Sequence, residues 1–380
     1  MPQALVVDAV RTPIGRAAKG SLRDVRPDDL AALAIRAVVD ASGIDPGTLT
    51  DHALGTGYPE GRQGANLARR ASLLAGLPVE LPGTTVNRFC ASSLQAVRMA
   101  AHALRAGEAD AYLVSGVESV SQVGRTTRDE DKHPAFVSGP LSDVYIPMGV
   151  TAENVAERYR ISRADMDELA AASHRKAVAA QDSGLLARDI VPVRRPDGVV
   201  VGTDDGPRRD TSPERLAALP PAFREGGTVT AGNSCPLNDG AAAAVLVTEE
   251  TAARQGLTPR ARIVATAVSG VDPAFMGVGP IEAIRAVLER TGHRITDVDV
   301  VELNEAFAAQ VLAVCRAVGI EMAQLNPAGG AIALGHPFGM TGVRLLASLI
   351  TNLEATGGRL GLATLCVGGG QGMALLLERL

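Results

Sequence analysis

An internal repeat constrains the fold of this chain more than any other feature of its sequence. Ala34–Val38 recurs unchanged as Ala283–Val287, at an offset of 249 residues (283 − 34), and Gly43 and Gly292 keep the same offset. Each copy predicts a strand, a loop, a helix that ends at the glycine, and a second strand. These copies run from the strand Ala4–Val10 to Leu54 and from the strand Ala261–Val268 to Leu303. A duplicated unit is the simplest explanation.

Strands that alternate with helices predict an α/β fold in which mixed sheets are buried between layers of helices. The chain has 380 residues, too many for one ordinary core, and its composition is 46% hydrophobic but only 3% aromatic, which predicts tightly packed aliphatic layers. The stretch between the copies departs from the repeat, and Ser162 begins a capping-box pattern there. We therefore expect an N-terminal half (1–118), an inserted loop domain (119–247) and a C-terminal half (248–380), with the chemistry where the halves meet.

Cys90 lies where an apolar strand gives way to an amphipathic helix. Leu94, Val97, Ala101 and Leu104 recur at helical spacing, and the pattern stops at Gly107. The helix is therefore predicted to begin just after Cys90, with its free N–H groups and positive dipole end directed at the sulfur, which favours the thiolate. A small buried hydrophobe is the alternative interpretation, because most free cysteines are of that kind.

Two glycine-rich segments favour the catalytic interpretation. His336 lies in the loop of residues 326–342, just before a helix whose apolar residues share one face. Cys366 ends an apolar strand and is followed by four glycines within residues 368–372, which allow backbone N–H groups to approach a ligand closely. A second thiol is thus predicted beside a second loop.

These segments, together with the Cys90 segment and Asn304-Glu305-Ala306-Phe307, resemble the thiolase family, whose members make or break 3-oxoacyl-CoA. The four motifs occur in the family's order and span nearly the whole chain. The resemblance implies an acetyl-CoA C-acyltransferase that cleaves 3-oxoacyl-CoA with CoA through an acyl-Cys90 intermediate. It also implies duplicated α/β units with a loop domain that covers CoA.

The resemblance assigns a role to each motif residue. Cys90 would be the nucleophile, and His336 would take its proton. Cys366 would be the acid that protonates the departing enolate, and the base in the reverse condensation. His336 and a water held by Asn304 would stabilise the enolate oxygen, whereas the backbone N–H groups of Cys90 and Gly368 would stabilise the tetrahedral adduct.

The resemblance also implies an apolar channel for CoA, which would be a co-substrate and not a bound cofactor. Cys235 stands where relatives commonly carry Ser or Ala, so we expect a wall residue there and not a third catalytic thiol. The residues expected along the channel are Met148, Phe223, Ala231, Cys235, Leu237 and Phe307.

Composition excludes several other classes of protein. The net charge of −5 and the absence of a basic tail argue against a nucleic-acid partner. No apolar stretch reaches the length of a membrane span, and no signal-peptide pattern precedes the first strand. Four widely spaced cysteines fit neither a metal knuckle nor a disulfide framework. We expect a cytoplasmic enzyme without a metal, which by resemblance would be a homodimer or homotetramer active in fatty-acid degradation.

Several alternatives remain open at this stage. The chain could be a biosynthetic acetoacetyl-CoA-forming thiolase, or a catalytically silent thiolase-like subunit that binds CoA or lipid. A decarboxylating ketosynthase would need two histidines, and the motifs supply only His336. A redox sensor that pairs Cys90 with Cys366 is a fourth alternative. The sequence of the His336 loop resembles that of degradative enzymes more than that of acetoacetyl-CoA-forming ones. This resemblance predicts that acyl chains longer than four carbons are accepted, with Phe338 at the end of the acyl pocket.

Overall fold

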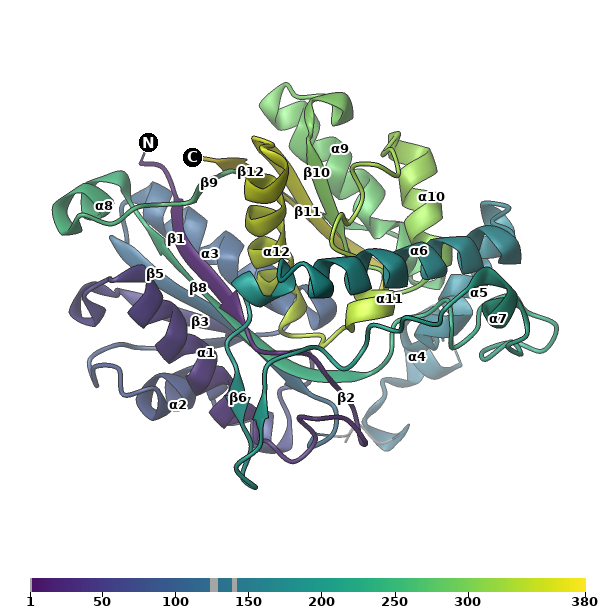
Figure 1. Cartoon of the computed structure of the whole chain (residues 1–380), viewed down its shortest axis with the longest axis horizontal. Helices are drawn as coiled ribbons and strands as arrows, with labels where there is room; N and C mark the ends of the chain where they lie inside the picture. The colour runs from purple at the N-terminus through teal and green to yellow at the C-terminus, as the bar shows by residue number, and fades with distance from the viewer. Residues whose placement is uncertain (1, 124–128, 139–141) are drawn as a thin grey trace.

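The computed structural model describes residues 2–123, 129–138 and 142–380 and shows two α/β halves joined edge to edge (Figure 1). The strands follow one another in the order β10 (Val300–Leu303), β11 (Leu360–Val367), β12 (Gln371–Arg379), β9 (Ala261–Gly270), β1 (Leu5–Arg11), β8 (Asn238–Val247), β5 (Ala111–Ser119), β3 (Asp51–Gly55) and β4 (Thr84–Val86). A short strand, β2 (Gly15–Arg16), also pairs with β8. All these strands belong to one hydrogen-bonded sheet, but only two residue pairs, both near Leu5, join β1 to β9. The sheet of each half is the part on one side of this junction.

Helices cover both faces of each sheet, as the sequence predicts. The central layer contains α3 (Ser92–Ala106) and α12 (Thr341–Thr356), which contact each other and lie between the two sheets. The outer layers contain α1 (Pro27–Ser42) and α2 (Leu67–Leu74) on the N-terminal half, and α9 (Gly279–Thr291) and α10 (Ala308–Val318) on the C-terminal half. The sheets are therefore buried on both faces.

Strand β8 shows how this layering is built from a simple sequence. Ala242, Ala244 and Leu246 pack in the central core with α3 and α12, whereas Ala241 and Ala243 pack in the outer core with α1. Side chains alternate between the faces of a strand, so an alanine-rich strand supplies two cores at once. Small residues let the helices approach the sheet closely, in agreement with the low aromatic content.

The longer helices of the inserted segment lie on the C-terminal half, whereas its β-hairpin packs on the N-terminal half (Figure 1). It contains α4 (Pro134–Val137), α5 (Met148–Arg158), α6 (Arg163–Asp182), β6 (Val193–Arg194), β7 (Val200–Val201) and α7 (Pro213–Ala217). Helix α6 packs on α10 and on α11 (Ala331–Leu334). Residues 238–247, which we expected at the end of the insertion, instead form β8 of the N-terminal sheet. All their side chains are buried, and successive side chains pack on opposite faces of the sheet, as in a central strand.

Local signals at the helix ends behave as predicted. The Ser162 hydroxyl accepts a hydrogen bond from the Asp165 amide (3.1 Å) and caps α6. Helix α3 ends at Gly107, which has a left-handed φ of 75° that favours glycine. The remaining helix, α8 (Glu249–Gln255), follows β8. Short 3-10 turns are η1 (Pro46–Thr48), η2 (Gly61–Gln63), η3 (Phe89–Ala91), η4 (Asp129–Asp131), η5 (Ser142–Tyr145), η6 (Leu186–Arg188), η7 (Pro273–Val278) and η8 (Ile295–Asp297).

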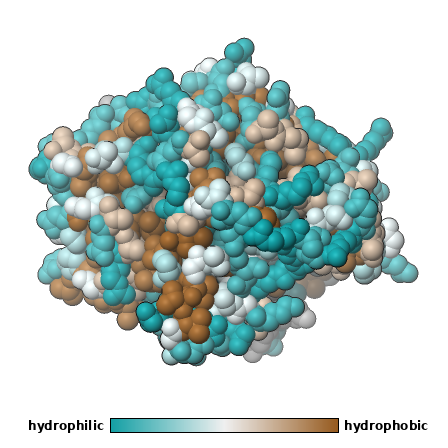
Figure 2. All heavy atoms as spheres, in the orientation of Figure 1, coloured by the Kyte–Doolittle hydropathy of each residue, from teal (hydrophilic) through white to brown (hydrophobic). Residues whose placement is uncertain are grey.

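The surface in the orientation of Figure 1 is largely hydrophilic (Figure 2). Hydrophobic side chains gather below the centre of this face, around the β6–β7 hairpin, where Val199 and Val200 are exposed. Within the described residues, no helix is long and apolar enough to cross a membrane.

The parallel pairs β3–β5 and β10–β11 direct their carboxyl ends toward the loops that carry the predicted motifs.

Candidate active site

Cys90 occupies the tight turn η3 between β4 and α3. Phe89 has a positive φ of 43°, an uncommon conformation for a residue other than glycine. The Ser92 hydroxyl oxygen accepts a hydrogen bond from the Arg88 amide (2.9 Å), which closes the turn. The turn therefore holds the half-buried thiol at the start of α3, where the sequence predicts it.

Burial, and not the helix terminus, dominates the electrostatics of this thiol. Burial raises the pKa of Cys90 to about 12, and the carboxylate of Glu118 contributes to the rise. The Gly368 backbone amide acts in the opposite direction and lowers this pKa, but it does not outweigh burial. The thiolate expected from the sequence is therefore not the resting form, so a base must accept the proton during reaction.

His336 is held by two polar groups, one from β8 and one from the loop. Its amide donates to the Asn238 side-chain oxygen (2.9 Å), and its Nδ1 lies 2.7 Å from the Thr341 hydroxyl. That hydroxyl donates its single proton to the Pro337 carbonyl (2.8 Å), which requires Nδ1 to carry the ring proton and leaves Nε2 as an acceptor. Burial, followed by the charge of Arg344, lowers the pKa of His336 to about 3, so the ring is neutral near pH 7.

Asn304 follows β10 and meets this ring. Its Nδ2 lies 3.4 Å from His336 Nε2, and both residues are buried. Its side-chain oxygen has no hydrogen-bond partner within the part of the chain that the structure describes. A buried acceptor of this kind requires a donor, so the Asn304–His336 pair is suited to hold a water or a polar group of a substrate.

Cys366 and Gly368 reach the site from the end of β11. Burial raises the pKa of the Cys366 thiol well above its usual value, and the neighbouring thiols of Cys90 and Cys235 add to the rise. A Cβ atom on Gly370 would lie 2.2 Å from the Val271 carbonyl oxygen, so this loop requires glycine. The structure thus brings Cys90, Gly368 and Cys366 together. No hydrogen bond between Cys90 and His336 is present among the described residues.

Comparisons with known proteins agree with this arrangement. The description "Thiolase, N-terminal domain" matches residues 4–250, and "Thiolase, C-terminal domain" matches residues 257–379. The chain belongs to the thiolase family. Its relatives include a Pseudomonas aeruginosa beta-ketoadipyl-CoA thiolase, 46% identical over 99% of both chains, and a Bacillus subtilis 3-ketoacyl-CoA thiolase, 42% identical over 100% of both.

Two further comparisons concern a named substrate and a solved structure. The Escherichia coli K12 3-oxoadipyl-CoA/3-oxo-5,6-dehydrosuberyl-CoA thiolase is 45% identical over the full length of both chains. The crystal structure of the Bacillus anthracis acetyl-CoA acetyltransferase superposes with a TM-score of 0.93 at 40% identity, over 100% of this chain and 99% of that one. The predicted fold class is confirmed, and thiolase acyltransferase chemistry is the family's activity.

Four of the residues expected along the CoA channel of this thiolase lie close together. The rings of Phe223 and Phe307 meet edge to face with centroids 5.9 Å apart. The Cys235 amide donates to the carbonyl of Ala306, next to Phe307 (3.0 Å). A side chain on Gly368 would lie 3.8 Å from the Met148 sulfur, which places Met148 beside the catalytic loop.

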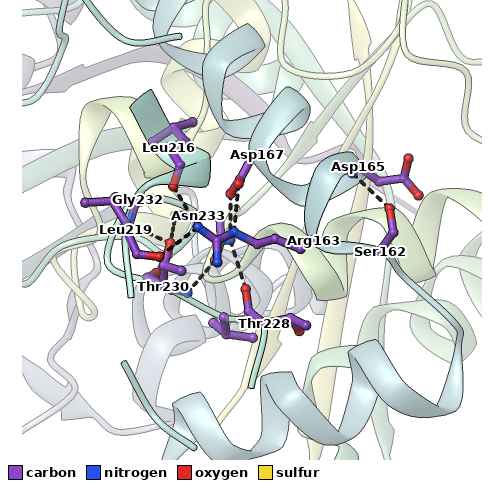
Figure 3. Close-up of polar contacts among 12 residues, drawn as sticks. Ser162, Arg163, Asp165, Asp167, Leu216, Leu219, Thr228, Thr230, Gly232 and Asn233 are labelled. Atoms are coloured by element: carbon purple, nitrogen blue, oxygen red, sulfur yellow. Dashed lines mark hydrogen bonds and ion pairs between the residues drawn. The ribbon is translucent and has the colours of Figure 1, made fainter. Parts of the chain in front are cut away.

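The two other expected residues, Ala231 and Leu237, are exposed at the surface. The turn that carries Ala231 is held on α6 by a network of polar contacts (Figure 3). Asp167 accepts hydrogen bonds from Arg163 (2.7 Å) and from the Asn233 amide group (2.9 Å). Asn233 in turn accepts from the Thr230 amide (2.8 Å). Helix α6 thereby positions one rim of the expected channel.

Sequence reasoning missed Glu118, the buried carboxylate at the end of β5. Its oxygens accept hydrogen bonds from the Gly57 amide (2.6 Å), the Gln63 side chain (2.6 Å) and the Gly339 amide (2.8 Å). Gly339 belongs to the His336 loop, so Glu118 fastens that loop to the N-terminal half. A carboxylate within an otherwise apolar strand was the available signal. Among the described residues, no group of three potential ligands could hold a metal ion.

Proposed function

We propose that this thiolase cleaves 3-oxoacyl-CoA by thiolysis through an acyl-Cys90 intermediate. The Cys90 sulfur attacks the 3-oxo carbon, and His336 Nε2 takes the thiol proton. The bond between carbons 2 and 3 then breaks, the acyl group stays on sulfur, and Cys366 gives its proton to the acetyl-CoA enolate. The thiol of free CoA then attacks the thioester and gives its proton to the Cys366 thiolate. The shortened acyl-CoA leaves, and the Cys90 thiolate takes its proton back from protonated His336.

The observation that carries the proposal is the position of the Gly368 backbone amide, which acts on the Cys90 thiol and lowers its pKa. It places a backbone donor from the C-terminal half beside a thiol of the N-terminal half, as an oxyanion hole at an attacked carbonyl requires. The free acceptor of Asn304 and the adjacent His336 ring supply a second site, suited to the enolate oxygen.

The expected substrates are 3-oxoacyl-CoA esters longer than four carbons. Six of the relatives at 43–46% identity are named beta-ketoadipyl-CoA thiolase, which adds the dicarboxylic ester 3-oxoadipyl-CoA to the candidates. Phe338 meets the rings of His336 (5.1 Å) and Tyr58 (5.7 Å) edge to face, and we place it at the end of the acyl pocket.

The decisive assay measures loss of 3-oxoacyl-CoA on addition of CoA. The substrates are acetoacetyl-CoA, the six- and eight-carbon esters and 3-oxoadipyl-CoA, tested with the parent and with Phe338→Ala. Each methylene buried in an apolar pocket contributes up to about 0.8 kcal/mol, so kcat/KM should rise with length until the pocket ends. A strict preference for acetoacetyl-CoA would favour the biosynthetic alternative. No turnover of any ester would favour a silent subunit.

We also propose that the enzyme is a homo-oligomer. Strand β4 ends the sheet of the N-terminal half, and no strand in the described part of the chain pairs with its outer edge. Exposed strand edges favour pairing with another chain. Leu73, Leu74 and Val79, which lie shortly before β4, are exposed. Light scattering at micromolar concentration should report a dimer or tetramer, and a fully active monomer would contradict the proposal.

A further inference from the structure

A buried ion pair, Arg344–Glu302, lies directly behind Asn304 and His336. Arg344 Nη1 is 3.4 Å from a Glu302 carboxylate oxygen, and both side chains are 1% exposed. The Asn352 side chain donates to the other Glu302 oxygen (2.8 Å). None of these residues belongs to the predicted catalytic set.

The backbone places the ion pair next to Asn304 and His336, the proposed catalytic pair. On β10, Val300 packs in the central core, whereas Val301 and Leu303 pack in the outer core. Glu302 and Asn304 therefore share the central face of the strand. On α12, Arg344 lies three residues after Thr341, so the two side chains lie on one face of the helix. Thr341 holds the His336 ring, so Arg344 lies next to the residue that positions His336. Glu302 lies next to Asn304 on the same face of the strand.

Stability alone does not account for this arrangement. Removing two charges from water is costly, and apolar residues of similar volume often replace a buried ion pair without loss of stability. The pair is also incompletely satisfied, because Arg344 Nε and Nη2 have no hydrogen-bond partner among the described residues. The guanidinium of Arg344 is thus incompletely hydrogen-bonded in a dry region, where charge acts over longer distances than in water. The carboxyl groups of Glu302, Glu305 and Asp189 act on this charge, and the charge itself acts on the His336 ring.

We propose that Arg344 and Glu302 are a positioning pair that sets the spacing of Asn304 and His336 and directs positive charge toward the oxygen which those two groups bind. This inference rests on the proposed function, in which that oxygen becomes an enolate. Burial raises the pKa of Glu302 to about 7, which leaves the charge of Arg344 less compensated. A positive field fixed in advance favours the enolate over the neutral thioester and therefore accelerates the step without tightening substrate binding.

The principal test removes both charges, because removal of one would leave the other buried and unpaired. In the double variant Arg344→Met with Glu302→Leu, exchange of the acetyl-CoA α-protons in D2O, followed by NMR, should fall about 10²-fold. The kcat of thiolysis should fall in parallel, while KM changes by less than about threefold. Exchange within about threefold of the parent would overturn the proposal.

Two single variants test whether charge is the cause, and Arg344→Lys, which keeps both charges, also serves if the double variant does not fold. Arg344→Lys keeps the charge and should exchange at least about tenfold faster than the double variant or, if that variant is unfolded, within about tenfold of the parent. Glu302→Gln leaves the charge of Arg344 uncompensated and should exchange at the parent rate or faster. A slower rate in Glu302→Gln, or Arg344→Lys as slow as the double variant, would refute the role of charge.

The matched control is the half-buried pair Arg260–Glu354 (2.9 Å), which lies near the N-terminal end of β9, away from the site. Arg260→Met with Glu354→Leu should retain exchange and kcat within about twofold of the parent. The two proposals fail separately. A parent enzyme without thiolysis or exchange contradicts the proposed function, whereas an active parent with an unaffected Arg344–Glu302 variant contradicts only this inference.

Discussion

The two halves of the molecule share one backbone plan but carry different side chains in the loops at the carboxyl ends of their strands. The register pair Asp51–Tyr112 of β3 and β5 corresponds to Val300–Gly361 of β10 and β11, each at the offset of 249 residues (300 − 51, 361 − 112). Helices α3 and α12 begin at the same offset, at Ser92 and Thr341. The duplication seen in the sequence is therefore a duplication of structure.

The same offset pairs each reactive residue with an unreactive one. Asn304 corresponds to Gly55 and Cys366 corresponds to Val117. His336 corresponds to Asn87, whose side chain is used locally to donate to the Gly57 carbonyl and to accept from the Phe89 amide. The N-terminal half contributes the proposed nucleophile, and the C-terminal half contributes the groups that would handle protons and oxyanions.

The nucleophile itself has a glycine as its counterpart. Gly339 stands where Cys90 would stand in the other half, and a Cβ atom there would lie 2.5 Å from Thr56 Cα and from the Val117 carbonyl oxygen. The C-terminal turn is thus closed against the N-terminal half, whereas the Cys90 turn is open enough for a half-buried thiol. Duplication gave two equivalent turns, and only the turn of Cys90 is packed loosely enough to leave its side chain partly accessible.

The largest expected effect comes from making the two turns alike. Cys90→Gly copies the residue at Gly339 and should lower the kcat of thiolysis by at least about 10⁴-fold, because the acyl group loses its attachment point. Incubation of the parent with acetyl-CoA, followed by peptide mass spectrometry, should locate an acetyl group on Cys90. A variant that cleaves substrate near the parent rate would refute the assignment of the nucleophile.

The second prediction compares the buried carboxylates Glu118 and Glu305, one from each half. Glu118→Gln presents an amide group to the N–H donors of Gly57 and Gly339 and should displace the His336 loop. We expect a loss of about 1–3 kcal/mol in stability and about 10²-fold in kcat. Denaturant titration and thiolysis kinetics would measure these losses.

Glu305→Gln is the matched control for that comparison. Glu305 binds Ser173 (2.6 Å), Asn326 (2.8 Å) and the Ile332 amide (3.1 Å), which brace the inserted segment and α11 and not the Gly339 turn. It should cost similar stability but less than about tenfold in kcat. Equal kinetic losses in the two variants would show that Glu118 does not act through the His336 loop.

The third prediction compares the thiols of the two halves as the pH changes. Because burial raises the pKa of Cys90 to about 12, its thiolate fraction should rise about tenfold per pH unit between pH 7 and 9. The rate of alkylation by iodoacetamide, followed by mass spectrometry of the Cys90 peptide, should rise in proportion. The more deeply buried Cys366 should react more slowly. A plateau at neutral pH would show instead that the helix terminus sets the pKa of Cys90.

The smallest expected effect concerns the equivalent glycines that end α1 and α9. Gly43 and Gly292 have left-handed φ values of 69° and 71°, and no atom would lie within 4 Å of a Cβ at either position. Gly43→Ala and Gly292→Ala should each cost about 1 kcal/mol of unfolding free energy, with kcat unchanged. A difference between them much above about 0.5 kcal/mol would show that the halves tolerate strain unequally.

The motifs predicted from the sequence lie where local chemistry predicts them. Cys90, His336 and Gly368 each stand in a turn next to a strand or helix end, and glycine and apolar spacing mark such turns in any fold. Glu118 and Arg344 escaped notice because their roles depend on partners more than 40 residues away along the chain, at Gly57 and Gly339 for the first and at Glu302 for the second. The sequence around a residue does not indicate which distant residues it contacts in the folded protein.

The sequence by itself determined the duplicated α/β plan, the helix boundaries at Gly107 and Gly292, and which residues are candidates for the reactive groups, because spacing and turn chemistry are local properties. Only the tertiary structure decided the charge state of those groups. The helix start beside Cys90 predicts a thiolate, yet packing of both halves around the thiol raises its pKa, and Arg344 together with burial keeps His336 neutral. Desolvation depends on every atom that surrounds a group, and that surrounding exists only once the two halves have come together.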